Sequence, residues 1–111
     1  MIDLKSLTIK KAHQDIKSGK YSSVDLAKAY LDEISKKDSE IHAYLEVFSD
    51  VIEQAKVADM KFKDGKETIM TGIPFAIKDN ILIKGRIASS ASKILENYHA
   101  TYDASVIRKL K

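Results

Sequence analysis

Only two short stretches of this chain have the pattern of a β-strand, and this scarcity limits the folds open to it. Residues 41–48, IHAYLEVF, carry apolar side chains at every second position, which is typical of a strand with one buried face. Residues 75–77 are an apolar run that predicts a buried strand, with Gly72 as a turn signal before it and Pro74 near its start, where a missing backbone donor is tolerated. Sheets usually contain about 4–6 strands, so these two can form only part of one.

Helix patterns occupy much of the remaining sequence. Thr8 is placed to cap a short helix and Gly19 to stop it. Its apolar positions, at offsets of three and four, are Ile9, Ala12 and Ile16. A second helix is predicted to begin at Ser22 or Ser23, because Ser22 and Asp25 have the spacing of a capping box. It fades within residues 35–40 after an apolar stripe of Ala27, Tyr30, Leu31 and Ile34.

Further helices are predicted toward the C-terminus. Ser49 is placed to cap a third helix, which should end before Asp64 and has the apolar stripe Val51, Ala55, Ala58 and Phe62. Residues 87–98 are expected to hold a short helix. Asp103 is placed to cap a last one, whose apolar residues are Val106, Ile107 and Leu110.

These helices and strands together predict the α/β class. The last predicted helix runs to Lys111 without a glycine, a proline or another C-cap signal. Natural domains seldom stop within an apolar stripe, so we expect the domain to be unfinished at this point.

Composition excludes several functions. With 44% hydrophobic and 32% charged residues the chain belongs to the globular class, and no apolar run approaches the ~18–20 residues that cross a bilayer. It has no cysteine, which excludes disulfides and thiolate metal sites. It also lacks the apolar core of a secretory signal, so we expect a cytoplasmic location. The net charge of +3 is spread without the basic stripe of a nucleic-acid-binding surface.

Lys78 follows residues 75–77 at a point where the predicted strand should still be buried. Burial lowers the pKa of an amine, and a neutral lysine can accept a proton from a serine hydroxyl. The alternative is a lysine at a strand end that reaches solvent, with Asp79 and Asn80 in an ordinary turn. Spacing alone favours this second interpretation, because buried lysines are rare.

Other polar residues give weaker signals. Loop formation and helix capping are better interpretations than catalysis for three serines that lack a glycine-flanked elbow, Ser89, Ser90 and Ser92. The histidines share no metal-ligand spacing: His13, His42 and His99. His13, at the border of a helix face, and His42, on one face of a strand, are expected to be structural. The glycines are isolated, which excludes a phosphate-cradling loop.

The segments TGIPFAIKDNILIKG (residues 71–85) and SSASKILENYHATYDASVIRKLK (residues 89–111) resemble the amidase signature family. The second segment tilts the resemblance toward the glutamine-hydrolysing members that belong to tRNA-dependent amidotransferases. The opening helices and IHAYLEV also match, so the resemblance spans the chain. It implies an α/β/α fold around a mixed sheet, with residues 1–111 as the N-terminal portion of a single amidase domain, truncated before a Gly/Ser-rich catalytic region.

The resemblance also implies a Ser-cisSer-Lys triad, whose lysine matches Lys78. In the family this lysine accepts a proton through a bridging cis-serine, and the nucleophilic serine attacks glutamine to release ammonia. Both serines lie in the Gly/Ser-rich stretch that follows residue 111 in the family, so neither role passes to residues 89–92. Asp79 and Asn80 match the motif and are expected only to shape the strand end. We therefore expect this chain alone to be inactive.

The resemblance further implies partner subunits B and C, glutamine as the substrate, and contact with tRNA through the complex. ATP and magnesium are implied for the whole complex, whereas this chain is expected to bind no cofactor or metal and no membrane. Two alternatives stay open. One is part of another amidase that acts on a small amide without tRNA, and the other is a stand-alone binding or structural module.

Overall fold

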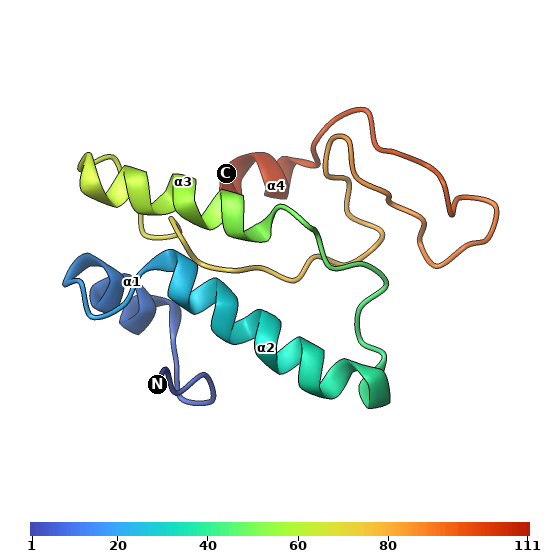
Figure 1. The fold of residues 1–111 in the computed structure, drawn as a ribbon. Coiled ribbons are helices and arrows are strands. Elements are labelled where there is room, and N and C mark those ends of the chain that lie inside the picture. The colour runs from blue at the N-terminus through green and yellow to red at the C-terminus, as the bar shows by residue number, and fades with distance from the viewer. The chain divides into compact units, whose positions relative to one another are not determined.

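Four helices make up all the regular secondary structure in the computed structural model, which describes residues 1–111 (Figure 1). They are α1 (Ile9–Lys17), α2 (Ser23–Ile41), α3 (Val51–Lys63) and α4 (Ser105–Leu110). The chain divides into two units, Met1–Pro74 with α1 to α3, and Phe75–Lys111 with α4. None of the helices combines the length and the apolar character needed to cross a membrane.

The predicted starts of the first two helices are confirmed, because local hydrogen bonds set both of them. At the start of α1, Thr8 Oγ1 accepts the N–H of Lys11 at 3.1 Å. At the start of α2, Ser22 Oγ accepts the Asp25 N–H and the Asp25 carboxylate accepts the Ser22 N–H, which completes the predicted capping box. The second helix then continues to Ile41, beyond the residues where its apolar stripe fades.

The core of the first unit lies where α1 meets the beginning of α2. Ala12 and Ile16 of α1 are buried together with Leu26 of α2. Partly buried apolar side chains pack around them: Ile2, Leu4, Leu7, Tyr21, Tyr30, Phe62 and Ile73. Two of the three apolar positions predicted for the first helix therefore face the core, whereas Ile9 is exposed.

The helices α2 and α3 form a hairpin in which they run in opposite directions, joined by residues 42–50 (Figure 1). The carboxylate of Asp59 on α3 accepts the N–H groups of Ser23 at 2.7 Å and Val24 at 3.2 Å. The first N–H groups of a helix have no partner within it, and an acidic group beside them is favourable. Asp59 therefore adds to the cap of α2 and ties it to α3.

Two predicted caps are wrong. Both α3 and α4 begin without a side-chain cap bond, so neither Ser49 nor Asp103 caps a helix. The Asp103 carboxylate instead accepts the Lys84 N–H at 2.8 Å and the Lys111 ammonium at 2.9 Å. These longer-range bonds occupy the oxygens that a cap would have used.

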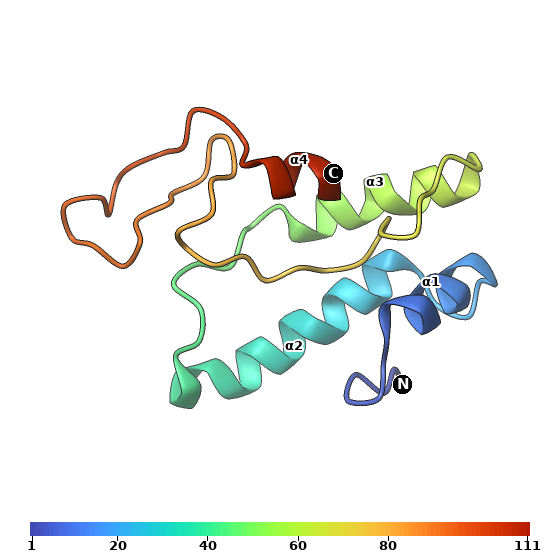
Figure 2. The ribbon, with the colours of Figure 1, turned by 180° about the vertical axis from the view of Figure 1, so that it is seen from behind.

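The short helix predicted for residues 87–98 is also absent. This segment forms turns, and Ile87 pairs with His99 in an isolated antiparallel bridge. The Ala88 N–H donates to the Tyr98 C=O at 3.1 Å beside this bridge. Figure 2 shows the segment as an extended loop whose two ends lie side by side. Pairing of its two ends satisfies backbone groups that a helix would have bonded internally.

Neither predicted strand forms, so the sheet of the predicted α/β fold is not present in this structure. Residues 42–48 and 73–78 have no regular structure. A strand needs the N–H and C=O groups of another strand beside it, and this chain provides none to either segment. His42, expected on a strand face, instead ends α2 with a left-handed φ of 53°.

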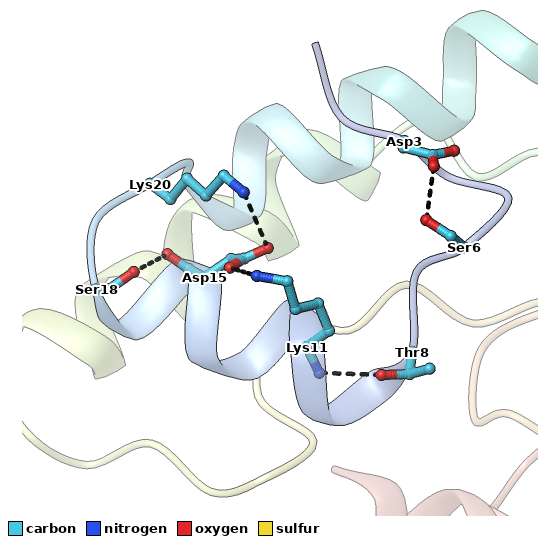
Figure 3. Close-up of polar contacts among 7 residues, drawn as sticks. All are labelled: Asp3, Ser6, Thr8, Lys11, Asp15, Ser18 and Lys20. Atoms are coloured by element: carbon cyan, nitrogen blue, oxygen red, sulfur yellow. Dashed lines mark hydrogen bonds and ion pairs between the residues drawn. The ribbon is translucent and has the colours of Figure 1, made fainter.

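Asp15 holds two lysines beside the core of the first unit (Figure 3). Its carboxylate lies 2.5 Å from Lys11 Nζ and 3.9 Å from Lys20 Nζ, and its C=O accepts the Ser18 hydroxyl. The hydrogen bond from Lys11, helped by the charges of both lysines, lowers the pKa of the Asp15 carboxyl below its ordinary value of 3.8. Asp15 is buried, so its charged form depends on these partners.

We expect Asp15→Asn to remove part of the acid sensitivity of folding. Because the pKa of Asp15 is lower in the folded chain than in the unfolded chain, its charge stabilises the fold above about pH 4, and this contribution is lost as the pH falls through the folded value. The free energy of unfolding, measured by urea denaturation at a series of pH values, should therefore fall less steeply with acid in Asp15→Asn. Asp32→Asn, at an exposed site on α2, is the control and should follow wild type. Equal slopes in Asp15→Asn and wild type would contradict the prediction.

Candidate functional site

Lys78 lies in the second unit, at the first position of a turn. The Ile81 N–H donates to the Lys78 C=O at 2.9 Å, which places Asp79 and Asn80 at the two central positions. The Lys78 side chain is exposed, and its amine forms no hydrogen bond or ion pair in this structure. Of the two interpretations of Lys78, a buried amine is not seen in this chain, where the residues before it form no strand. The alternative of a solvent-facing lysine followed by a turn describes this arrangement.

The next residue, Asp79, is the centre of the hydrogen bonds around this turn. Its carboxylate accepts the Ser89 N–H at 3.2 Å, the Ala91 N–H at 3.1 Å and the Ser89 hydroxyl. The Asp79 C=O also accepts the Ser90 N–H at 3.2 Å. These bonds join Asp79 to residues 89–91, ten to twelve positions later in the chain.

The backbone of residues 89–91 has a shape that suits an anion. Ser90 and Ala91 have φ values of 49° and 57°, in the left-handed region that residues other than glycine seldom adopt. Turn conformations of this kind direct successive N–H groups to one side and create a concave anion-binding arrangement. In this structure the Asp79 carboxylate occupies that position.

The contacts favour the ionised form of Asp79. The hydrogen bond from the Ser89 hydroxyl lowers the pKa of the Asp79 carboxyl below 3.8, followed by the bonds from the Ala91 and Ser89 N–H groups and a smaller effect of the Lys78 charge. An ionised carboxylate accepts hydrogen bonds without donating any, which matches three donors directed at it. The arrangement is therefore favoured at neutral pH and weakens as the pH falls below about 4.

The loop-forming role predicted for the serines agrees with the structure. Ser89 is buried and bonded to Asp79, and the Ser92 N–H donates to the Ser89 C=O at 2.8 Å. None of the three serine hydroxyls contacts Lys78, so the chain brings Asp79 and residues 89–91 together but contains no Ser–Lys pair.

The sequence predicts for Asp79 only a role in shaping the strand end, and it misses the contact with residues 89–91. The available signal was the pair Ser89-Ser90, since short hydroxyl side chains favour turns and local hydrogen bonds. This signal predicts a loop but does not identify the carboxylate that the loop binds.

The remaining candidates do not form a site. The His13 ring packs against Phe62 with the ring centroids 5.6 Å apart, which agrees with a structural role. No group of three or more His, Cys, Asp or Glu side chains could hold a metal ion. The chain therefore offers no ligand set of this kind for the magnesium that the resemblance implies for the whole complex.

A family model described as amidase matches residues 25–111. Curated relatives that carry the name of the A subunit of glutamyl-tRNA(Gln) amidotransferase are 41% identical over 111 residues in Dehalococcoides mccartyi strain CBDB1, 39% over 110 residues in Thermoanaerobacter pseudethanolicus and 40% over 113 residues in Endomicrobium trichonymphae. The alignments cover 99%, 98% and 100% of this chain but 23%, 22% and 23% of these relatives. The chain thus spans a little over a fifth of the length of the relatives it matches.

Proposed function

The chain belongs to the amidase family, and from this premise we propose that it is part of the glutamine-hydrolysing A subunit of a tRNA-dependent amidotransferase. The observation that carries the proposal is the identity of 39–41% to proteins of that name along the whole chain. The matched residues 25–111 include Lys78 and the loop that holds its neighbour. The name of these relatives points to glutamyl-tRNA(Gln) as the acceptor.

In the proposed reaction, Lys78 accepts a proton from a bridging serine of a Ser-cisSer-Lys triad, whose two serines come from the rest of the protein. The bridging serine takes the proton of the nucleophilic serine, whose oxygen then bonds to the amide carbon of glutamine. The C–N bond breaks, and ammonia leaves with a proton returned through the same groups. Water then releases glutamate and restores the serine.

This role requires Lys78 to be covered. An amine accepts a proton only when neutral, and removal from water favours the neutral form. Lys78 is exposed here, so we propose that the rest of the protein buries it and removes it from water. The rest of the protein would also supply the neighbouring strands of the mixed sheet, in which residues 41–48 and 75–77 would become strands. The apolar side chains of Leu45 and Phe75 support this, since 75% and 47% of their surfaces are exposed in the chain alone.

We further propose that the complete protein works with partner subunits B and C, which use the released ammonia to amidate the tRNA-bound glutamate in the cytoplasm. The ATP and magnesium chemistry is assigned to these partners, as the family resemblance implies. The two serines of the proposed triad come from the rest of the protein, so the chain alone is expected to release no ammonia from glutamine.

A chimera tests the proposal. In it, residues 1–111 replace the aligned part of the Dehalococcoides mccartyi relative, which supplies the remainder of the protein. With the partner subunits co-expressed, we expect the purified chimera to release ammonia from glutamine and to form glutaminyl-tRNA(Gln). Residues 1–111 alone should do neither. A chimera that folds and assembles but does not hydrolyse glutamine would contradict the proposal.

A further inference from the structure

We propose that Asp79 is a positioning residue, which fixes the turn that carries Lys78 by binding residues 89–91. This inference rests on the proposed function, because it concerns how the base is held. Asp79 is assigned no contact with the reacting atoms. It acts through the backbone that it shares with Lys78.

Hydrogen bonds hold the backbone on the C-terminal side of Lys78. The Lys78 C=O accepts the Ile81 N–H at 2.9 Å, and the Asp79 C=O accepts the Ser90 N–H at 3.2 Å. The lysine side chain can still rotate, but these bonds restrict the position of the Cα atom from which it starts. Such a fixed origin helps an amine to meet a hydroxyl at hydrogen-bonding distance.

The segment that binds Asp79 is itself anchored. Ala88 and Ser89 are buried, with 5% and 8% of their surface exposed. The Ala88 N–H donates to the Tyr98 C=O at 3.1 Å, next to the bridge that closes the loop. Asp79 therefore ties the turn to a paired segment of backbone.

Backbone strain in this segment indicates that the contact is specific. Two successive residues other than glycine, Ser90 and Ala91, have positive φ, which is unfavourable and persists only where the surroundings enforce it. In this conformation the N–H groups of Ser89 and Ala91 reach the same carboxylate as the Ser89 hydroxyl. Strain of this kind is concentrated at functional elements of proteins.

The hydrogen bonds of the Asp79 carboxylate are directed to residues 89–91 and not to Lys78. A free carboxylate beside an amine favours the ammonium form, which cannot accept a proton. Three donors surround the Asp79 carboxylate, and it forms no ion pair with Lys78. The charges of Asp79 and Lys78 still interact, but Asp79 holds the turn without a direct contact to the amine.

The full-length chimera tests this inference, with Lys78→Ala as the reference for loss of the base. We expect Asp79→Ala to lower kcat about 10- to 100-fold with KM for glutamine nearly unchanged, since a misplaced base slows proton transfer and leaves substrate binding intact. Asp79→Asn keeps an acceptor oxygen and should recover part of the loss. Ser89→Ala removes one donor and should lower kcat less than Asp79→Ala. Ser105→Ala is the matched control, because this exposed hydroxyl of the second unit does not contact Asp79 or residues 89–91, and it should keep wild-type kcat.

Amide hydrogen exchange in the 111-residue chain gives a readout without activity. Asp79→Ala should speed exchange at the Ser89 and Ala91 N–H groups and leave the N–H groups of α1 unchanged. Unchanged exchange at Ser89 and Ala91 would overturn the inference.

The kinetic outcomes separate this inference from the proposed function. If Lys78→Ala abolishes activity while Asp79→Ala and Ser89→Ala keep wild-type kcat, Asp79 does not position the base and the proposed function stands. A raised KM and a lower melting temperature in Asp79→Ala, with kcat unchanged, would show a purely structural role and also overturn the inference. An active Lys78→Ala enzyme would remove the proposed function itself.

Discussion

Gly72→Ala is expected to destabilise the first unit by about 2–5 kcal/mol, the sum of a backbone effect and a steric effect. Gly72 has a φ of +79°, which side chains other than glycine seldom allow. A Cβ atom at this position would lie 2.2 Å from Ser23 Oγ and 3.1 Å from Ser23 Cβ. Ser23 has little room to move, because it is 1% exposed and its N–H is bonded to Asp59 at 2.7 Å.

A matched glycine separates the two effects. Gly19 has nearly the same φ, +78°, but a Cβ atom there would meet nothing within 4 Å. Urea denaturation should therefore show a loss of about 1–2 kcal/mol for Gly19→Ala, from the backbone alone. Adding Ser23→Gly to Gly72→Ala should recover the steric part. Equal losses for Gly72→Ala and Gly19→Ala would show that the collision with Ser23 does not occur.

The sequence predicts Gly72 as a turn residue but does not indicate that it lies close to Ser23. The same difference between local features, which can be predicted, and long-range contacts, which cannot, is found elsewhere in the chain. Helix starts at Thr8 and Ser22 are predictable because both partners of each cap lie within three residues. Asp59, which caps α2 from another helix, has no local signature, since its partners are 35 and 36 residues away. Features that depend on the fold become visible only in the structure.

The two predicted strands show that a local pattern can also predict a structure that does not form. Alternation in residues 41–48 indicates side chains that suit a sheet, but it cannot supply the neighbouring strand. Without that neighbour, the segment is irregular and Leu45 is 75% exposed. A period-two pattern thus indicates only that the side chains suit a strand. The capping patterns in this chain, by contrast, include both partners of the hydrogen bonds that start each helix.

The candidate site likewise contains one residue that the sequence indicates and one set of contacts that it does not. The motif around Lys78 indicates the lysine from sequence alone, because a family resemblance needs no knowledge of packing. The bonds between Asp79 and residues 89–91 could not be predicted, because the two positive φ values that direct the N–H groups arise from the folded loop. Sequence therefore indicates the residue proposed to react, and structure indicates the residue proposed to hold it.

Lys78→Ala in the full-length chimera is expected to lower kcat for glutamine hydrolysis by about 10²–10⁴-fold, the usual contribution of a general base. Without the amine, the bridging serine has no acceptor for its proton and the nucleophile stays protonated. Assembly with the partner subunits, measured by gel filtration, should be unchanged because the Lys78 side chain makes no polar contact in this structure. Lys93→Ala removes an exposed lysine from the second unit and is the control, with wild-type kcat expected.

Lys78→Arg distinguishes proton transfer from simple charge. Arginine has a similar length and a positive charge, but it stays protonated in proteins and cannot act as a base. If Lys78 accepts a proton, Lys78→Arg should be as inactive as Lys78→Ala. If Lys78 serves only to place a positive charge near the substrate, Lys78→Arg should retain most of the activity. Wild-type turnover in the arginine variant would therefore exclude Lys78 as the base, even if the alanine variant were inactive.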